Sequence, residues 1–259
     1  MKKVSWVGVI MLTGILFAAT ATAPAYAFEI GARAFVWFPQ YKGDMKIDSD
    51  NLAGSAINAV DDLGLGNEIY PEVEVYGGIG KHHLSLMYTS MDHSGLKNVT
   101  KNIIFNGVNY AAGSVINTDL KSKMLDLEYQ YDLINLENLL AGFSIGLIGK
   151  VKYLDCEAQL IAPTVGESKD TLQYFIPMVG AGAHIGLLAN LLEARAKVTG
   201  MGYGGDNMIY EGLAEISVTP FPFLDIHGGY RHLKMKVDRK SFFMDSQFSG
   251  PYLGLSVGF

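Results

Sequence analysis

Cysteine is almost absent from this chain of 259 residues, because Cys156 is the single one. One thiol cannot form an intramolecular disulfide, so other forces must hold the fold together. Basic charge is also scarce: 20 Lys and Arg residues stand against 26 Asp and Glu residues, which gives a net charge of −6. An acidic chain without a basic cluster argues against nucleic acid as a partner. Beyond residue 27 the chain also lacks any uncharged apolar run of the roughly 20 residues that a membrane-crossing helix needs.

The first 27 residues have a different composition. Lys2 and Lys3 precede an apolar stretch over residues 4–19, and Ala25-Tyr26-Ala27 places small residues at the two positions that a signal peptidase reads. This is the layout of a secretory signal peptide. A membrane-anchoring helix is the alternative, but the apolar stretch is slightly short for one and Pro24 favours cleavage. We expect residues 1–27 to be a cleaved signal peptide for Sec-type export, and residues 28–259 to form one mature domain.

Apolar and polar side chains alternate along most of the mature chain. Successive side chains of a β-strand point to opposite faces, so this alternation predicts strands with one apolar and one polar face. The pattern recurs in about ten segments of roughly 10–14 residues, whereas strands of globular proteins usually have about 5–6. A tilted strand that crosses a bilayer needs about 9–11 residues. The segment lengths therefore favour strands that cross a membrane.

The polar faces of these segments carry many charges. A sheet in lipid must close on itself, with apolar side chains outward and charged ones inward. A soluble β-sandwich would also explain the alternation, although not the strand lengths. We therefore expect an all-β fold, a single closed antiparallel transmembrane β-barrel of about 10 strands, with 8 or 12 as alternatives. The charged residues expected to face its lumen are Glu72, Glu74, Glu128, Lys150, Lys152, Glu193, Arg195, Lys197, Glu211, Glu215 and Arg231.

The connections between the segments fall into two sets. Short ones are expected near Lys81, at 189–190 and at 220–222, and long ones over 39–70, 92–114, 157–170 and 238–247. Transmembrane barrels have short periplasmic turns and long extracellular loops, so the long set is expected outside the cell. Residues 51–60 are a candidate short helix within the first loop. Aromatic residues near the strand ends are expected to form girdles at the two membrane interfaces, with Trp37, Tyr70 and Tyr203 in the outer one.

The last strand carries the most specific motif. It ends Gly254-Leu255-Ser256-Val257-Gly258-Phe259, and it resembles the last strand of the small outer-membrane β-barrel proteins of Gram-negative bacteria. In that family a terminal phenylalanine with apolar residues at alternate preceding positions is the signal read by the barrel-assembly machinery. Phe259, Val257, Leu255 and Leu253 match that signal. The resemblance implies an outer-membrane location, contact with outer-membrane lipid and lipopolysaccharide, and assembly by that machinery, but no activity.

Two short patterns resemble those of barrel enzymes. Asp225-Ile226-His227 together with Asp48-Ser49-Asp50 resembles the omptin proteases, ten-stranded barrels with an Asp-x-His and a pair of acids. His83-Leu84-Ser85 resembles the His-x-Ser of the lipid A deacylase barrels, and a histidine can activate a serine that shares its strand face. The predicted topology places Asp225 and His83 near short turns and Asp48 in a long loop, so the omptin-like groups are expected at opposite ends.

No other pattern predicts a chemical site. The six histidines show no metal-ligand spacing, so neither a metal nor a cofactor is expected, and no catalytic residue is assigned. A structural or surface-interaction role through the long loops is favoured. A narrow channel or transporter for small polar solutes is the alternative, although a barrel of ten strands is closer in size to filled barrels than to the open pores of about sixteen. A membrane-embedded hydrolase acting on lipid A or peptides is a lesser alternative.

Overall fold

The computed structural model describes residues 28–49, 52–136, 142–163, 165–187, 191–202, 207–239 and 241–259. These residues form strands, turns and loops. None of them belongs to a helix long and apolar enough to cross a membrane. The predicted signal peptide, residues 1–27, and the predicted turn at 189–190 lie outside the described residues.

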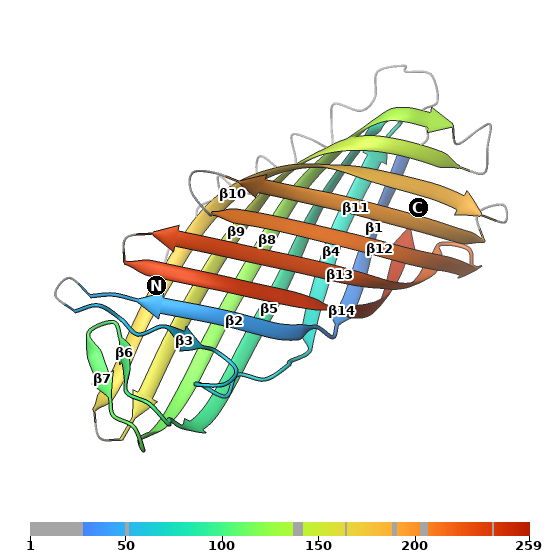
Figure 1. Cartoon of the computed structure of the whole chain (residues 1–259). Coiled ribbons are helices and arrows are strands. Elements are labelled where there is room, and N and C mark those ends of the chain that lie inside the picture. Colours follow the sequence, from blue (N-terminus) through green and yellow to red (C-terminus); the bar gives the residue numbers. More distant parts are fainter. Residues whose placement is uncertain are drawn as a thin grey trace, which may run out of the picture.

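Ten long antiparallel strands close into a barrel (Figure 1). Each strand pairs with the next one along the chain, and the first pairs back to the last, from Gly31 opposite Gly258 to Trp37 opposite Tyr252. Phe259 donates a backbone hydrogen bond to Ile30, so both ends of the described chain lie at one end of the barrel. The ten strands are β1 (Phe28–Trp37), β4 (Tyr70–Ile79), β5 (His82–Asn98), β8 (Val115–Leu136), β9 (Phe143–Ala162), β10 (Gly166–Leu187), β11 (Leu192–Gly202), β12 (Met208–Phe221), β13 (Leu224–Arg239) and β14 (Phe242–Gly258).

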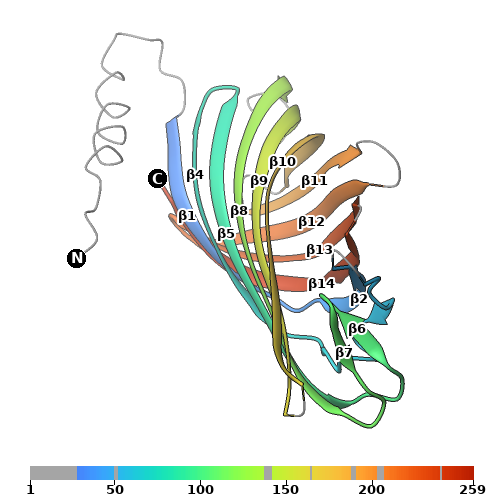
Figure 2. The ribbon, with the colours of Figure 1, turned by 90° about the vertical axis from the view of Figure 1, so that its left-hand side faces the viewer.

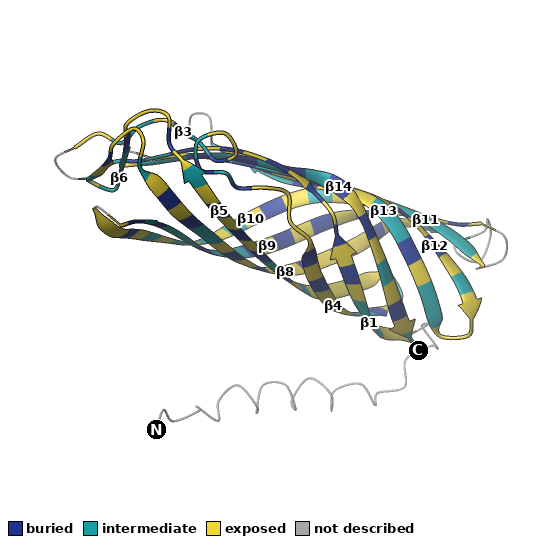
Figure 3. Ribbon diagram, turned by 90° about the horizontal axis from the view of Figure 1, so that it is seen from below, coloured by how far each residue is buried: buried dark blue, intermediate teal, exposed yellow. Residues whose placement is uncertain are grey.

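The two faces of the sheet differ in burial along each strand. Buried and exposed residues alternate down the strands in Figure 3. On β8, Leu125, Leu127 and Tyr129 are exposed on the outside, whereas Asp126 and Glu128 are buried inside. Large apolar side chains therefore form a band around the outside of the barrel, as the alternation predicts.

The outer apolar band ends where the outer face of the strands becomes polar and the inner face becomes apolar. On β8 the outer apolar band ends at Leu125, and beyond it Lys123 and Lys121 point outward while Met124 is buried inside. On β9, likewise, Cys156 lies inside and Asp155 outside. Each strand thus has apolar side chains outside near the termini, and apolar side chains inside at the opposite end. We call the two ends of the barrel the terminal end and the far end.

This exchange explains why several strands are longer than predicted. β8 and β10 have 22 residues each, and β9 has 20. Two segments predicted as long loops, 157–170 and 238–247, are instead the tips of the strand hairpins β9–β10 and β13–β14. Apolar and polar residues still alternate in these tips, but the polar residues now point outward and the apolar residues inward. The expected pattern of inward charges and outward apolar residues therefore ends before the strands do.

The four short strands lie at the far end, opposite the C-terminus (Figure 2). β2 (Gln40–Ile47) follows β1 after Phe38 and Pro39 and continues the pairing with β14. β3 (Ile57–Asn58) pairs with β2, while β6 (Ile103–Phe105) and β7 (Val108–Tyr110) form a separate hairpin. The candidate helix at 51–60 is wrong within the described residues, because 57–58 are a strand and 59–60 enter a turn.

Candidate functional site: the barrel interior

Two segments predicted as free loops fold together as a lid over the far end. The β6–β7 hairpin inserts Phe105 and Tyr110, which are fully buried, and the Tyr110 hydroxyl donates a hydrogen bond to the Leu160 carbonyl of β9 at 3.1 Å. Ser55 and Ile104 join the two segments through their backbones. We call residues 48–49, 52–69 and 99–114 the cap. Its buried apolar side chains are Ile57, Ala59, Leu63, Leu65, Val99, Ile103, Phe105 and Tyr110.

Below the cap, apolar and aromatic side chains fill the barrel. Tyr41 stacks on Phe248 with ring centroids 4.9 Å apart, and it lies 4.6 Å from the His93 ring. Trp37 packs against Phe248 at 6.2 Å. Six strands add methionines to this apolar layer, and these flexible side chains fill irregular gaps. They are Met45, Met91, Met124, Met178, Met235 and Met244.

The apolar layer corrects one prediction about the aromatic residues. Trp37 and Tyr70 were expected in a girdle at the membrane interface, but both point inward and are 0% and 1% exposed. They pack against each other at 6.0 Å, and the Tyr70 hydroxyl hydrogen-bonds to His93. The strand-end position suggested a girdle, but the inward face is apolar at this level of the barrel. Tyr203 of the predicted outer girdle lies outside the described residues.

A network of paired charges lies beneath the apolar layer. Lys150 Nζ lies 3.0 Å from Glu128 and 3.3 Å from Glu211, and Lys152 Nζ lies 2.7 Å from Asp126. The members of this ion network come from seven strands and include equal numbers of each sign. Its carboxylates are Glu72, Glu74, Asp126, Glu128, Glu211 and Glu215, and its cations are Arg33, Lys150, Lys152, Arg195, Lys197 and Arg231.

Arg231 and Lys152 are the two most enclosed members of the ion network. Arg231 has the larger set of partners. Its Nε donates to Glu211 at 2.7 Å, another nitrogen pairs with Glu72, and its guanidinium lies 4.7 Å from the Trp37 ring centre. Arg231 is 1% exposed and Lys152 is 0% exposed. A water-sized passage along these side chains would leave their surfaces accessible. Together with the apolar layer, the network therefore occludes the bore. Three interior cavities lined by described residues of these two layers measure about 50, 30 and 20 Å³.

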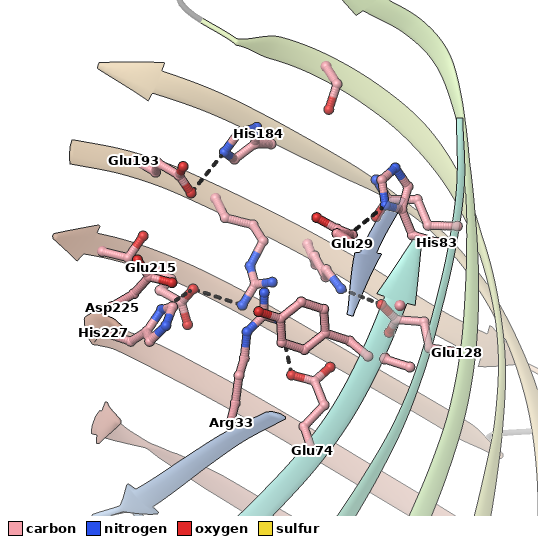
Figure 4. A pocket seen from close by; sticks show the side chains of 18 of the residues that line it. Glu29, Arg33, Glu74, His83, Glu128, His184, Glu193, Glu215, Asp225 and His227 are labelled. Atoms are coloured by element: carbon pink, nitrogen blue, oxygen red, sulfur yellow. Dashed lines mark hydrogen bonds and ion pairs between the residues drawn. The ribbon is translucent and has the colours of Figure 1, made fainter. Parts of the chain in front are cut away.

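A much larger cavity of about 570 Å³ lies between the ion network and the terminal end (Figure 4). We call it the vestibule. Arg33 lines it beside Tyr76, with the guanidinium 4.0 Å from the ring centre. The rim adds carboxylates that are absent from the ion network. These rim carboxylates form hydrogen bonds with histidine, amide and hydroxyl groups. The pairs are Glu29 with His83, Asp132 with His83 and Gln130, Glu193 with His184, and Asp225 with Thr219 and Ser256.

All eleven charged residues predicted for the lumen lie inside the barrel: ten in the ion network and Glu193 at the vestibule rim. Two members of the network were not predicted. Asp126 alternates with Glu128, so the strand pattern could have included it. Arg33 is flanked by two alanines in β1, so no neighbouring charge in the sequence indicates its partner. Pairing of β1 with β4 places Glu74 at 3.0 Å from Arg33.

Three side chains near the vestibule have the order of a catalytic triad. His227 lies 2.8 Å from the Ser256 hydroxyl through Nε2 and 3.1 Å from Glu215 through Nδ1. Ser256, however, is 1% exposed and its hydroxyl donates to Asp225 at 2.8 Å. A nucleophile must reach its substrate and release its proton to the base. Since Ser256 does neither, these contacts serve to hold β12, β13 and β14 together.

The omptin-like groups lie at opposite ends of the barrel. Asp48 follows Ile47, which is opposite Phe242, whereas Asp225 is opposite Ser256. These two positions on β14 are roughly 45 Å apart at about 3.3 Å per residue. Asp50 lies outside the described residues. In the second pattern, His83 turns both ring nitrogens toward Glu29 and Asp132.

Two further sequence predictions concern metals and assembly. In the described part of the chain, no three His, Cys, Asp or Glu side chains are grouped closely enough to hold a metal ion. Four residues of the predicted assembly signal are exposed on the outer face of β14: Leu253, Leu255, Val257 and Phe259. Their role in assembly stays a prediction.

Comparison with known proteins shows similarity in structure only. No family model and no curated protein sequence matches the chain. The outer membrane protease OmpT from Escherichia coli is similar over 93% of this chain and 99% of its own, with a TM-score of 0.60 and 9% identity. The translocator domain of the autotransporter NalP from Neisseria meningitidis is similar over 96% of this chain and 94% of its own, with a TM-score of 0.43 and 11% identity. Neisserial surface protein A is similar over 90% of this chain and 97% of its own, with a TM-score of 0.37 and 13% identity. The fold is thus that of Gram-negative outer-membrane barrels.

Proposed function

We propose that the mature chain is an outer-membrane protein with a non-conducting barrel, which holds a folded extracellular cap for interactions at the cell surface. The observation that carries this proposal is the occluded bore. A barrel whose interior is filled by an ion network, an apolar layer and a lid is suited to rigid support and not to diffusion. The cap supplies a shaped surface, because its segments are packed together around their own buried core.

Location and orientation are part of the same proposal. The outer apolar band suits the hydrocarbon of a bilayer, and contact with outer-membrane lipid and lipopolysaccharide follows from it. The terminal end carries short turns, which supports a periplasmic location for this end and an extracellular location for the cap. Residues 1–27 would direct Sec-type export, and the exposed alternate residues of β14 would be read by the barrel-assembly machinery.

A protease role like the one that names OmpT is not proposed. The two acidic groups that would have to meet, Asp48 and Asp225, are separated by the length of the barrel. The narrow channel is the competing function, and conductance decides between the two.

Planar bilayers that contain the purified barrel should carry no steady current, with an open porin as the positive control. Lys150→Met and Glu128→Gln should lower the stability of the barrel and leave the membrane silent, because the side chains around them still fill the bore. A reproducible single-channel conductance whose ion selectivity shifts in these variants would refute the closed barrel and establish the channel.

Complementation tests the role of the cap. In a strain that lacks this protein, a chain whose residues 99–114 are replaced by a short Gly-Ser linker should fold and reach the surface, but should not restore the lost phenotype. The matched control, Asn109→Val, changes one exposed side chain of the cap and should restore it. Full complementation by the linker chain would contradict a function carried by the cap.

A further inference from the structure

The vestibule has the size of a ligand site. Its volume of about 570 Å³ lies within the roughly 300–1,000 Å³ of small-molecule pockets. It opens at the terminal end, where the side chains of Glu29 and Glu193 are 53% and 38% exposed. Its floor is the ion network, so a ligand can enter from this end and cannot pass through.

The vestibule carries unbalanced negative charge. Its three cations, Arg33, Arg195 and Lys197, are each paired with a carboxylate of the ion network. The four rim carboxylates have no salt bridge to a lysine or arginine within the described residues; their partners are histidines, hydroxyls and an amide. The rim therefore holds four negative charges in excess when its histidines are neutral. An enclosed site of one charge sign concentrates ligands of the opposite sign. The rim carboxylates are Glu29, Asp132, Glu193 and Asp225.

A second, independent feature points to a hydrogen-bond acceptor on the ligand. Arg33 Nε and Arg195 Nε are buried and have no hydrogen-bond partner among the described residues. Figure 4 shows Arg33 reaching into the cavity beside Glu74. A buried donor without an acceptor is costly. Arg33 and Arg195 line the vestibule, so a turn of either guanidinium toward the cavity would let a carbonyl or carboxylate of a ligand accept from its Nε.

We propose that the vestibule binds a basic amino acid or a short basic peptide from the periplasmic side. The ammonium groups lie against the rim carboxylates, and the carboxylate or a peptide carbonyl accepts from Arg33 and Arg195. An amine that carries no hydrogen-bond acceptor can pair only with the rim carboxylates and leaves the arginine donors without a partner. An acidic peptide is repelled by the rim carboxylates. The periplasmic access of the vestibule rests on the orientation in the proposed function. The binding itself does not depend on the closed bore or on the cap, so each proposal can fail without the other.

Calorimetric titration of the full-length mature protein in detergent tests the proposal. Lysyl-lysine should bind saturably, free lysine and cadaverine more weakly, and glutamyl-glutamate not at all. Free lysine that binds as tightly as lysyl-lysine assigns the site to amino acids and still supports the proposal. No saturable binding of any of these probes, or equal binding of the acidic dipeptide, would overturn it.

Variants separate the two halves of the site. Glu29→Gln alone, and together with Glu193→Gln, should lower the affinity for lysyl-lysine, the double variant by about tenfold or more. Both residues lie at the exposed mouth, so the barrel should fold normally. The matched control is Glu157→Gln, which removes a partly exposed carboxylate paired with Lys169 near the far end. An unchanged affinity in the double variant would overturn the assignment of the rim.

Arg33→Lys keeps the charge beside Glu74 and removes the Nε donor. This variant should lower the affinity for lysyl-lysine and leave the affinity for cadaverine unchanged. Heat-modifiable migration on a gel verifies that the variant is folded. Equal weakening of both probes would overturn the role of the arginine donors.

Discussion

At the scale of single residues, the interior is governed by the cost of burying charge. An ion inside a barrel loses its hydration, and only close partners of opposite sign offset that loss. Arg231 meets this condition through Glu211 on the neighbouring strand β12 and through Glu72 on β4, which does not pair with β13. Removing one partner is more damaging than removing a pair, because the remaining charge keeps its desolvation cost.

Arg231→Met should therefore destabilise the barrel by about 3–5 kcal/mol, because it leaves buried carboxylates without their cation. Urea unfolding followed by the fluorescence of Trp37, the single tryptophan of residues 28–259, measures the change. Adding Glu72→Gln should recover part of the loss. The control Lys121→Met alters an exposed lysine outside the barrel and should have little effect. A single variant as stable as the control would show that the network contributes nothing.

His93 makes the stability of the far end depend on pH. On β5 the three outward residues that follow Tyr88 are polar (Ser90, Asp92 and Ser94), so His93 lies beyond the apolar band. Burial lowers the pKa of His93 to about 4 from its usual 6.5. As the pH falls from 6.5 toward 4, the unfolded chain takes up a proton that folded His93 does not, so stability is lost over this window.

The variant His93→Phe should lose less stability on acidification. Between pH 7.5 and 4.5 the free energy of unfolding should fall by roughly 2–3 kcal/mol more in the parent chain than in the variant. Carboxylates common to both proteins cancel in this difference. Identical pH profiles would mean that His93 is protonated as readily in the fold as in the unfolded chain.

At the scale of elements, the strands were predicted from alternation and the cap was not. Residues 99–114 contain turn signals and few regular patterns, so they resemble a loop. Asn106-Gly107 is nevertheless a hairpin turn, with φ of 46° and 79° at its two central residues. Both residues adopt the left-handed conformation that such a turn requires. Its strands are held by contacts with Ser55 and Leu160, which lie far away in the sequence.

Gly107→Val should loosen the cap without affecting the barrel. The left-handed backbone conformation costs a side chain about 1–2 kcal/mol, and a Cβ here would also lie 3.1 Å from Ser49. Hydrogen exchange should accelerate at the amides of 103–110 and stay slow in β8 and β9. The control Asn109→Val, on the extended strand β7, should leave the exchange unchanged. Equal acceleration in barrel strands would mean that cap and barrel unfold as one unit.

At the scale of the whole molecule, occlusion is redundant. The cap, the apolar layer and the ion network each close the interior at a different level. Opening the barrel therefore requires more than the removal of its lid. This arrangement supports the proposed non-conducting barrel despite its many inward charges, because methionine and aromatic side chains fill the interior between the ion network and the far end.

A chain with residues 99–114 replaced by a linker should consequently remain non-conducting in planar bilayers. Trp37 and Arg231 still block the bore below the missing hairpin. The current should resemble that of the intact chain at every voltage. A steady current after replacement of the hairpin would show that the cap alone closes the barrel.

The sequence by itself determined the closed antiparallel barrel and the inward placement of its charges. Period-two alternation is a local property, and each strand carries it independently. The tertiary structure alone decided which charges pair, as with Arg231 and Glu72, which lie 159 residues apart. It also decided that the far half of the interior is apolar and that the loops close over it. These features depend on distances across the barrel, which exist only after the strands have closed, and so no single segment encodes them.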